Sequence, residues 1–138
     1  IASRMAMGAD WCNAARAYMF AVGCIQAETC HTNTCPVGVA TQDKRLYRGL
    51  VITDKAERVY HFHKNTLGAL AQVVAAAGLE HPSELTPDHI CRRVSPTDVR
   101  AYSKIFEYLQ SGELLDSGGN EQWKDYWRSA RSDSFLPA

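Results

Sequence analysis

Residues 23–36 of this chain read GCIQAETCHTNTCP and place Cys24, Cys30 and Cys35 on one short segment. Thiolates are soft ligands, which favour iron–sulfur clusters, zinc or Cu(I) over cations that prefer oxygen. Because the segment supplies three thiols, it predicts a three-iron cluster or a metal site whose fourth ligand lies elsewhere. A chain that holds such a cluster transfers electrons.

Zinc is the alternative metal, since the same three cysteines and His31 offer three sulfur ligands and one nitrogen ligand. Structural zinc sites usually combine two short Cys-x(2–4)-Cys hairpins, and this segment lacks that pairing. The spacing therefore favours an iron–sulfur cluster and leaves open a zinc site or three reduced thiols packed in a core. Cys12 and Cys91 are expected to be small buried residues, because free cysteine is among the most buried types. Either could still be the fourth ligand.

The composition is that of one ordinary globular domain. The chain has 138 residues, 46% of them hydrophobic, and its 15 basic residues balance 15 acidic ones. This balance gives no reason to expect nucleic acid or an anionic membrane as a partner. The uncharged stretches Ala17–Ala27 and Leu67–Leu79 are shorter than the roughly 20 residues of a membrane-spanning helix, and no signal peptide is evident. We therefore expect a cytoplasmic protein with reduced thiols and no disulfide framework.

The sequence predicts a mainly helical chain with one strand at most. Ile1–Met7 reads as the end of a helix stopped by Gly8, and the absence of an initiating methionine suggests a piece of something longer. Ala9–Ala14 is a short segment that can form a strand. Four further helices are predicted, and the two nearest the C-terminus are indicated by a proline at the first helical position. They cover Arg16–Val22, Asp54–Ala77, a short stretch after Thr86-Pro87, and Thr97–Gln110.

The helix predicted over residues 54–77 has the clearest pattern. Its apolar side chains recur every three or four residues, which predicts one buried face. Thr53 or Asp54 is expected to cap the first turn, with Glu57 completing a capping box, and Gly78 is expected to end the helix. The residues of the predicted buried face are Val59, Phe62, Thr66, Leu70, Val73 and Ala77.

The other histidines and the charges of this helix are expected to be structural. His61 and His63 lie two residues apart and do not share a helical face, which argues against a metal pair. His81 and His89, each near a proline, are expected to cap short helices or to lie on the surface. Most of the basic side chains on the long helix are expected to be solvated, Lys55, Arg58 and Lys64 among them.

The cysteine segment and its flanks closely resemble the glutamate synthase family. The resemblance covers about residues 1–115 and identifies them as the C-terminal segment of the synthase domain, leaving residues 116–138 as a tail. In that tail, Trp123 and Trp127 can form one amphipathic turn on the core or a mobile end. The stretches that carry the resemblance are Gly23–Ala27, Cys30–Asp43, Gly8–Asp10, Asp54–Ala56 and Val59–Phe62.

The resemblance implies a fold, two cofactors and a reaction. Glutamate synthase domains are FMN-containing (β/α)8 TIM barrels, with a 3Fe-4S cluster beside the flavin that Cys24, Cys30 and Cys35 would bind. His31 would then be a neighbour of the cluster. Ammonia, released from glutamine by a separate glutaminase domain, adds to 2-oxoglutarate, and reduced FMN delivers hydride to the resulting imine. A reductase subunit or ferredoxin supplies the electrons through the cluster.

The resemblance also makes Ala9–Ala14 the eighth barrel strand. Phosphates in such barrels often lie near strands seven and eight, at a helix N-terminus. Ala14, Ala15 and Arg16 fall at that junction, so we expect the FMN phosphate near them. The alternative for Arg16 is an exposed residue at the start of a helix.

Two other functions stay open. A sibling enzyme that shares this domain, such as N-methylglutamate synthase, differs in using methylamine instead of ammonia. The second alternative is a non-enzymatic module, in which the loop binds zinc or a cluster only to organise helices. Metal analysis distinguishes a zinc-binding module from an iron–sulfur protein, because bound zinc gives no visible absorbance.

The chain alone is expected to form no glutamate, because the seven earlier strands and most of the flavin and 2-oxoglutarate pocket are expected outside it, as is a glutaminase domain. The measurement is to incubate the polypeptide with FMN, a reductant, ammonia and 2-oxoglutarate. Glutamate above the background of a protein-free control would contradict this expectation.

Overall fold

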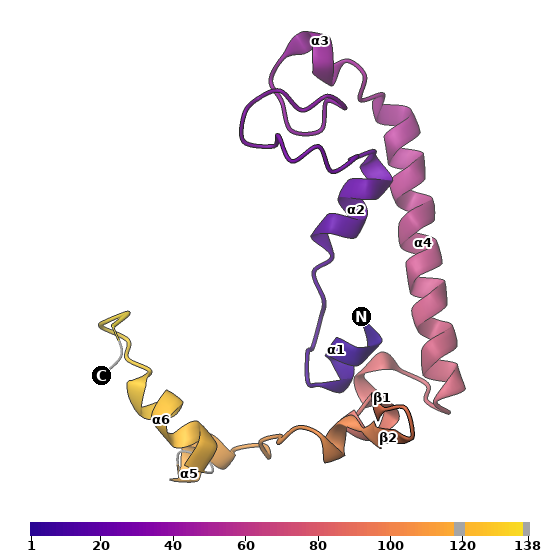
Figure 1. Ribbon diagram of the computed structural model, residues 1–138. Coiled ribbons are helices and arrows are strands. Elements are labelled where there is room, and N and C mark those ends of the chain that lie inside the picture. The colour runs from indigo at the N-terminus through magenta and orange to yellow at the C-terminus, as the bar shows by residue number, and fades with distance from the viewer. Residues whose placement is uncertain (118–120, 137–138) are drawn as a thin grey trace. The chain divides into compact units, whose positions relative to one another are not determined.

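In a computed structural model of the chain, residues 1–117 and 121–136 are described. The chain divides into two compact units, Ile1–Ile90 and Cys91–Ala138. The first unit is helical, with α1 (Ala2–Ala6), α2 (Ala15–Val22), α3 (Lys44–Tyr47), α4 (Ile52–Ala76) and the 3-10 turns η1 (Pro82–Glu84) and η2 (Pro87–His89) (Figure 1). The second unit holds strands β1 (Cys91–Ser95) and β2 (Asp98–Ala101), then η3 (Tyr102–Lys104), α5 (Glu113–Ser117) and α6 (Glu121–Ser129).

The predicted long helix is confirmed as α4, and the helix predicted at Arg16–Val22 is confirmed as α2. Gly78 ends α4 with a φ of +75°, and the N–H of Leu79 donates to the carbonyl of Val74 at 3.1 Å. This left-handed ending is typical of glycine after a helix. None of the helices in residues 1–117 and 121–136 has the length and apolar content needed to cross a membrane.

The predicted cap of α4 is wrong. The helix begins at Ile52 after an extended Val51 that makes no side-chain capping bond, so Thr53 and Asp54 lie inside the first turn. A side chain caps a helix only from the non-helical residue that precedes it. The N–H of Lys55 donates to the carbonyl of Val51 at 3.0 Å, which is the first bond within the helix and makes Val51 the N-cap residue.

The core of the first unit is small and lies where α1, α4 and η1 meet. Its buried side chains are Ala6, Val74 and Leu85, which are 2%, 3% and 5% exposed. The predicted face of α4 is largely right, since its other five members are half-buried. Val73, however, is 46% exposed and Val74 takes its place. At the C-terminal end of α4, Val74 is buried instead of Val73 because α1 and η1 pack against the side of the helix that carries Val74.

Helix α2 packs along α4 through one aromatic residue (Figure 1). The Tyr18 ring meets the Phe62 ring edge to face, with centroids 5.1 Å apart and an interplanar angle of 82°. The Tyr18 hydroxyl also forms a hydrogen bond with Nδ1 of His63. Edge-to-face pairs are a favoured aromatic geometry. The contact positions the end of α2, and therefore the start of the cysteine loop, beside α4.

The strand predicted at Ala9–Ala14 is wrong. These residues form an irregular link between α1 and α2, with Ala14 serving as the N-cap of α2. A strand needs a partner for its backbone N–H and C=O groups. Within the described residues, the two strands β1 and β2 pair with each other and leave no strand for this segment.

The helix predicted at Thr97–Gln110 is also wrong, because this region begins with a β-hairpin. Strands β1 and β2 are antiparallel, with Arg92 opposite Arg100 and an irregularity between Arg93 and Ser95. Pro96 sits in the turn that joins the strands, and the N–H of Thr97 donates to the Ser95 hydroxyl at 3.3 Å. A serine followed by proline begins a turn as readily as a helix, and here the turn forms.

The predicted roles of His81 and His89 are confirmed. The His81 ring accepts from the N–H of Ser83 at 3.2 Å at the start of η1. The His89 ring accepts from the N–H of Thr86 at 3.0 Å, around η2. Both histidines therefore satisfy backbone donors that a short helix leaves without partners.

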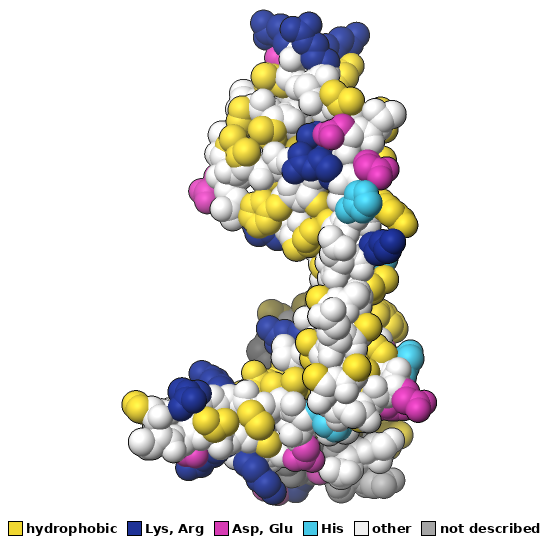
Figure 2. Space-filling model, turned by 90° about the vertical axis from the view of Figure 1, so that its right-hand side faces the viewer, with side chains coloured by type: hydrophobic (Ala, Val, Ile, Leu, Met, Phe, Trp, Pro, Cys, Tyr) yellow, Lys and Arg dark blue, Asp and Glu magenta, His cyan; other side chains and the backbone are white. Residues whose placement is uncertain are grey.

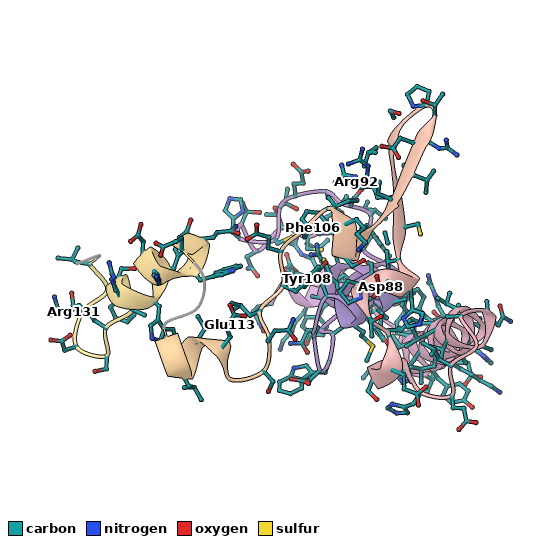
Figure 3. All side chains as sticks on the ribbon, turned by 90° about the horizontal axis from the view of Figure 1, so that it is seen from below. Asp88, Arg92, Phe106, Tyr108, Glu113 and Arg131 are labelled. Carbon is teal, nitrogen blue, oxygen red and sulfur yellow. The ribbon has the colours of Figure 1, made fainter. Side chains whose placement is uncertain are left out.

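In the second unit, the predicted tryptophan pair lies on the helix α6. The Trp123 and Tyr126 rings are 6.2 Å apart, while Trp127 is 47% exposed. Beyond α6, Arg131 pairs with Asp133 at 2.9 Å, and Glu113 at the start of α5 accepts from the N–H of Gln110 at 2.8 Å (Figure 3). The predicted boundary of the tail at residue 116 stays a prediction, and residues 118–120 and 137–138 of that tail lie outside the described part.

Replacing Val74 with Ala is expected to lower the free energy of unfolding by about 2 kcal/mol, because it removes two buried methyl groups and leaves a cavity. Val73→Ala, one position away on the same helix, is the matched control and is expected to change it by less than about 0.5 kcal/mol. Urea unfolding followed by circular dichroism measures both. Equal losses from the two variants would contradict the described face of α4.

Candidate metal centre

The cysteine segment is irregular, as predicted, and its backbone is unusual at three positions. Gln26, Glu28 and Asn33 have φ values of 58°, 57° and 63°. Residues other than glycine rarely adopt positive φ, although asparagine tolerates it better than most. Such positions persist only when surrounding contacts hold them, so the loop must be fixed by specific interactions.

Asn33 provides the first of these interactions. Its side-chain oxygen accepts from the N–H of Gln42 at 2.6 Å, and its carbonyl accepts from the Thr41 hydroxyl at 2.6 Å. The Thr41 oxygen in turn accepts from the N–H of Asp43 at 3.0 Å. These bonds close the loop onto the residues that lead into α3.

Asp43 then begins α3. Its carboxylate accepts from the N–H of Arg45 at 2.8 Å and pairs with the Arg45 guanidinium at 3.0 Å. These bonds hold the pKa of Asp43 below its ordinary value of 3.8. The bond from the Arg45 side chain has the larger effect and the bond from the Arg45 backbone the smaller one. A carboxylate at this position satisfies a free N–H of the helix and favours its first turn.

Gly38 is the second fixed point of the loop. It is buried with a φ of +79°, and a Cβ added to it would lie 2.6 Å from the carbonyl oxygen of Leu46 and 2.8 Å from Cα of Tyr47. Both neighbours are backbone atoms, which cannot turn away as a flexible side chain can. Only glycine therefore fits where the cysteine loop lies against α3.

The three predicted ligands differ in exposure. Cys24 is half-buried and its sulfur accepts from the N–H of Gln26 at 3.4 Å, Cys30 is exposed, and Cys35 is 7% exposed. All five cysteines of the chain are free thiols. The prediction that Cys91 is buried is wrong, because it lies on a two-stranded sheet that leaves its side chain exposed, and Cys12 is half-buried.

The backbone of the turn that follows Cys35 affects the pKa of its thiol. Hydrogen bonds from Ala40, and to a smaller extent from Val37, Val39 and Gly38, lower the pKa of this thiol below its ordinary value of 9.0, although burial acts in the opposite direction. Hydrogen bonds to a charged form favour that form. Cys35 is therefore biased towards the thiolate, the form that binds metal.

The donor set of the loop fits a soft metal or an iron–sulfur cluster by its chemistry. It offers three thiols on one segment, one of them biased towards thiolate, and the buried hydroxyl of Thr29, next to Cys30, has no hydrogen-bond partner. In residues 1–117 and 121–136, however, no three His, Cys, Asp or Glu side chains are close enough together to hold a metal ion. The exposed His31 belongs to no such group. Assignment of the three ligands therefore stays a prediction.

A cavity of about 530 Å³ opens beside the loop. Cys24 and Ile25 line it from the start of the loop, and Pro36 and Val37, next to Cys35, line it from the other end. Helix α4 contributes two basic residues, Lys55 and Arg58. Lys55, expected to be a solvated charge, has a side chain only 21% exposed. The sequence pattern of α4 gave no signal for this, because Lys55 is buried by α2 and the loop rather than by the apolar face.

The residues predicted near an FMN phosphate lie at the start of α2. Ala14 is its N-cap, Ala15 is its first residue, and no side chain caps this end of the helix. Arg16 is exposed. The first N–H groups of the helix and one guanidinium group are thus free to face an anion.

Comparisons with known proteins agree with the resemblance in the sequence. Residues 1–80 match a family described as the conserved region in glutamate synthase. The chain is 44% identical over 93 residues to the glutamate synthase large subunit-like protein YerD of Bacillus subtilis, covering 67% of the chain and 18% of that protein. It is 56% identical over 117 residues to the chloroplastic ferredoxin-dependent glutamate synthase 2 of Arabidopsis thaliana, covering 83% of the chain and 7% of that protein.

A third relative is the large chain of the NADPH glutamate synthase of Azospirillum brasilense, 33% identical over 79 residues, or 57% of the chain and 5% of that protein. The chain therefore spans less than a fifth of the length of each of these relatives. No solved structure matches it significantly.

Gly38→Ala is expected to displace α3 from the cysteine loop, because its new Cβ would collide with backbone. Gly78→Ala is the matched control: Gly78 also has a positive φ, +75°, but nothing lies within 4 Å of an added Cβ. Both variants carry the cost of about 1–2 kcal/mol for a left-handed non-glycine residue. Hydrogen exchange measured by mass spectrometry is expected to accelerate over residues 43–50 only in Gly38→Ala, and equal exchange in the two variants would contradict the contact.

Proposed function

This chain belongs to the glutamate synthase family, and on that premise we propose that it is part of an FMN- and iron–sulfur-dependent enzyme that reductively aminates 2-oxoglutarate to L-glutamate. Glutamine-derived ammonia from a separate glutaminase domain supplies the nitrogen. A reductase subunit or ferredoxin supplies the electrons, in keeping with the names of the Azospirillum and Arabidopsis relatives. The chain contributes the cysteine loop of that enzyme and the helices that surround the loop.

The observation that carries this proposal is the set of three cysteines on one loop. Cys24, Cys30 and Cys35 would hold the 3Fe-4S cluster, and the thiolate bias of Cys35 supports a role as a ligand. Thr29 supports the same assignment, because a buried hydroxyl without a partner is costly unless a bound group receives its hydrogen bond. Hydrogen bonds to sulfur are one of the means by which a protein sets the potential of a cluster.

The start of α2 supports a contribution to FMN binding. Ala14, Ala15 and Arg16 would face the flavin phosphate, with backbone N–H groups and a guanidinium as donors. The positive end of a helix favours an anion at this position. The same helix then leads directly to Cys24, so one element of eight residues connects the two cofactor sites.

When bound, the cluster supplies one-electron transfer and the flavin supplies hydride transfer. The chain's own residues have simpler tasks. The three thiolates hold the cluster, Asn33 and Gly38 fix the loop that presents them, and the packing of Tyr18 on Phe62 fixes α2. A loop that is fixed before binding loses less conformational entropy when it closes on its ligand.

The proposal predicts that the protein, purified anaerobically and supplied with iron and sulfide, carries iron, acid-labile sulfide and the electron paramagnetic resonance signal of an oxidised three-iron centre. Changing Cys24, Cys30 or Cys35 to Ser is expected to remove most of the signal, because an alcohol is a poor ligand for iron–sulfur clusters. Cys12→Ser and Cys91→Ser are the matched controls and are expected to keep it.

Two outcomes would overturn the assignment. Bound zinc without visible absorbance would favour a structural metal module, and iron retained equally in all five serine variants would show that the loop is not the ligand. Because every cysteine is free, each substitution removes one thiol and breaks no disulfide.

A further inference from the structure

We propose that the open edge of the strand β1 binds an extended, acidic segment of another polypeptide, which adds to the β-hairpin as a third strand. Adding a strand to an exposed sheet edge is a common mode of peptide recognition. The site lies in the second unit alone and needs neither the cysteine loop nor a cofactor. It consists of the backbone of β1 and the arginine side chains of the hairpin.

Both edges of the hairpin are open. Strands β1 and β2 form a two-stranded sheet, and among the described residues neither strand has a backbone hydrogen bond to another segment. The side chains of residues 91–94 in β1 are all exposed. The outer edge of β1 therefore offers a row of backbone N–H and C=O groups to a further strand.

The hairpin also has apolar surface that a further strand can cover. Val94 is 44% exposed and Val99 is 52% exposed, although both are residue types that favour strands. A two-stranded hairpin alone is marginally stable in water, and a third strand or a packed helix is needed for independent stability. Binding of one more strand therefore supplies both backbone partners and apolar contact.

The charges of the hairpin leave one arginine unpaired. Arg92 lies directly opposite Arg100, and like charges in this arrangement destabilise a strand pair. Asp98, the one acidic residue in positions 91–101, pairs with Arg100 at 2.7 Å. The Arg93 guanidinium donates to the carbonyl of Pro96 at 3.0 Å. Within the part of the chain that the structure describes, the Arg92 guanidinium has no ion-pair or hydrogen-bond partner.

A strand added beside β1 brings its side chains next to Arg92. Neighbouring strands lie about 4.8 Å apart, and directly opposite residues have Cβ atoms about 5 Å apart. An acidic residue opposite Arg92 can therefore pair with this guanidinium and offset the repulsion from Arg100. The edge of β2 is the weaker choice, because Asp98 already neutralises Arg100 on that strand.

The same charges argue against a second copy of this chain as the occupant. Strand β1 contains two arginines and no acidic residue, so pairing with the β1 of another copy would bring basic side chains together. Charged side chains on an exposed edge discourage this kind of self-association. The occupant that the edge favours is therefore an acidic strand of a different polypeptide.

The first unit has exposed basic side chains as well, gathered over α3 (Figure 2). They attract an acidic peptide through charge, but α3 is a helix of four residues and offers no strand edge. The location of a bound peptide therefore distinguishes pairing with β1 from attraction by charge alone.

The test uses the whole chain and two synthetic peptides, TEVEVET and TKVKVKT, which differ only in the sign of their charges. The glutamate peptide is expected to slow hydrogen exchange over residues 91–95, measured by mass spectrometry, because its backbone covers N–H groups of β1. The lysine peptide is expected to leave exchange there unchanged. Low salt is used, since salt screens the attraction between exposed charges.

Arg92→Glu is expected to reverse the preference. The lysine peptide then protects β1, and the glutamate peptide binds about fivefold more weakly than to the wild type, as measured by fluorescence anisotropy. The variant places an acidic side chain opposite Arg100, which favours the strand pair, and circular dichroism checks that the fold is kept. Lys44→Glu, on the exposed surface of α3, makes the same change of charge and is the matched control. It is expected to keep the wild-type preference.

Four results would overturn the assignment. Equal protection by the two peptides would show that charge does not select the strand. Protection confined to β2 or to α3 would place the peptide elsewhere. Slower exchange over residues 91–95 on raising the protein concentration alone would identify a second copy as the occupant. A wild-type preference in Arg92→Glu would show that Arg92 is not part of the interaction, whereas a reversed preference cannot arise from loss of the fold.

Discussion

The contact of Gly38 with the backbone of Leu46 and Tyr47 is the constraint on which the cysteine loop depends. It brings the end of the loop against α3 at a distance that excludes any side chain. Cys35 lies three residues earlier, and the backbone groups that lower the pKa of its thiol belong to the turn that this contact holds in place. The hydrogen bonds of Asn33 fix the middle of the loop to the residues before α3. Backbone fit, rather than apolar burial, therefore shapes the candidate metal centre.

The other end of the loop is fixed by helix packing. The Tyr18 ring joins α2 to α4, and α2 ends where Lys55 lies over Gly23. One interhelical contact thus sets the position of Cys24, the surroundings of the Lys55 charge and the cavity between them.

Part of the fold could be predicted from the sequence for local reasons. The repeat of Val59, Phe62 and Leu70 predicted α4, because a helical period follows directly from the chain. The roles of His81 and His89 followed from the neighbouring prolines. The hairpin of β1 and β2 could not be predicted in this way, since Ser95-Pro96 is compatible with a helix start and with a turn. Pairing between strands decided between them, and pairing is not visible in a local pattern.

The sequence by itself determined the chemistry of this protein: three thiols on a single loop, the helix that follows them and the family to which the pattern belongs. Spacing and side-chain type are local properties, so they can be read without a structure. Only the tertiary structure decided which thiol is buried and biased towards thiolate, why Gly38 must be glycine and which lysine of α4 faces the loop. These depend on backbone atoms and charges from segments far apart in the chain, whose distances are set only when α2, α3 and α4 pack around the loop.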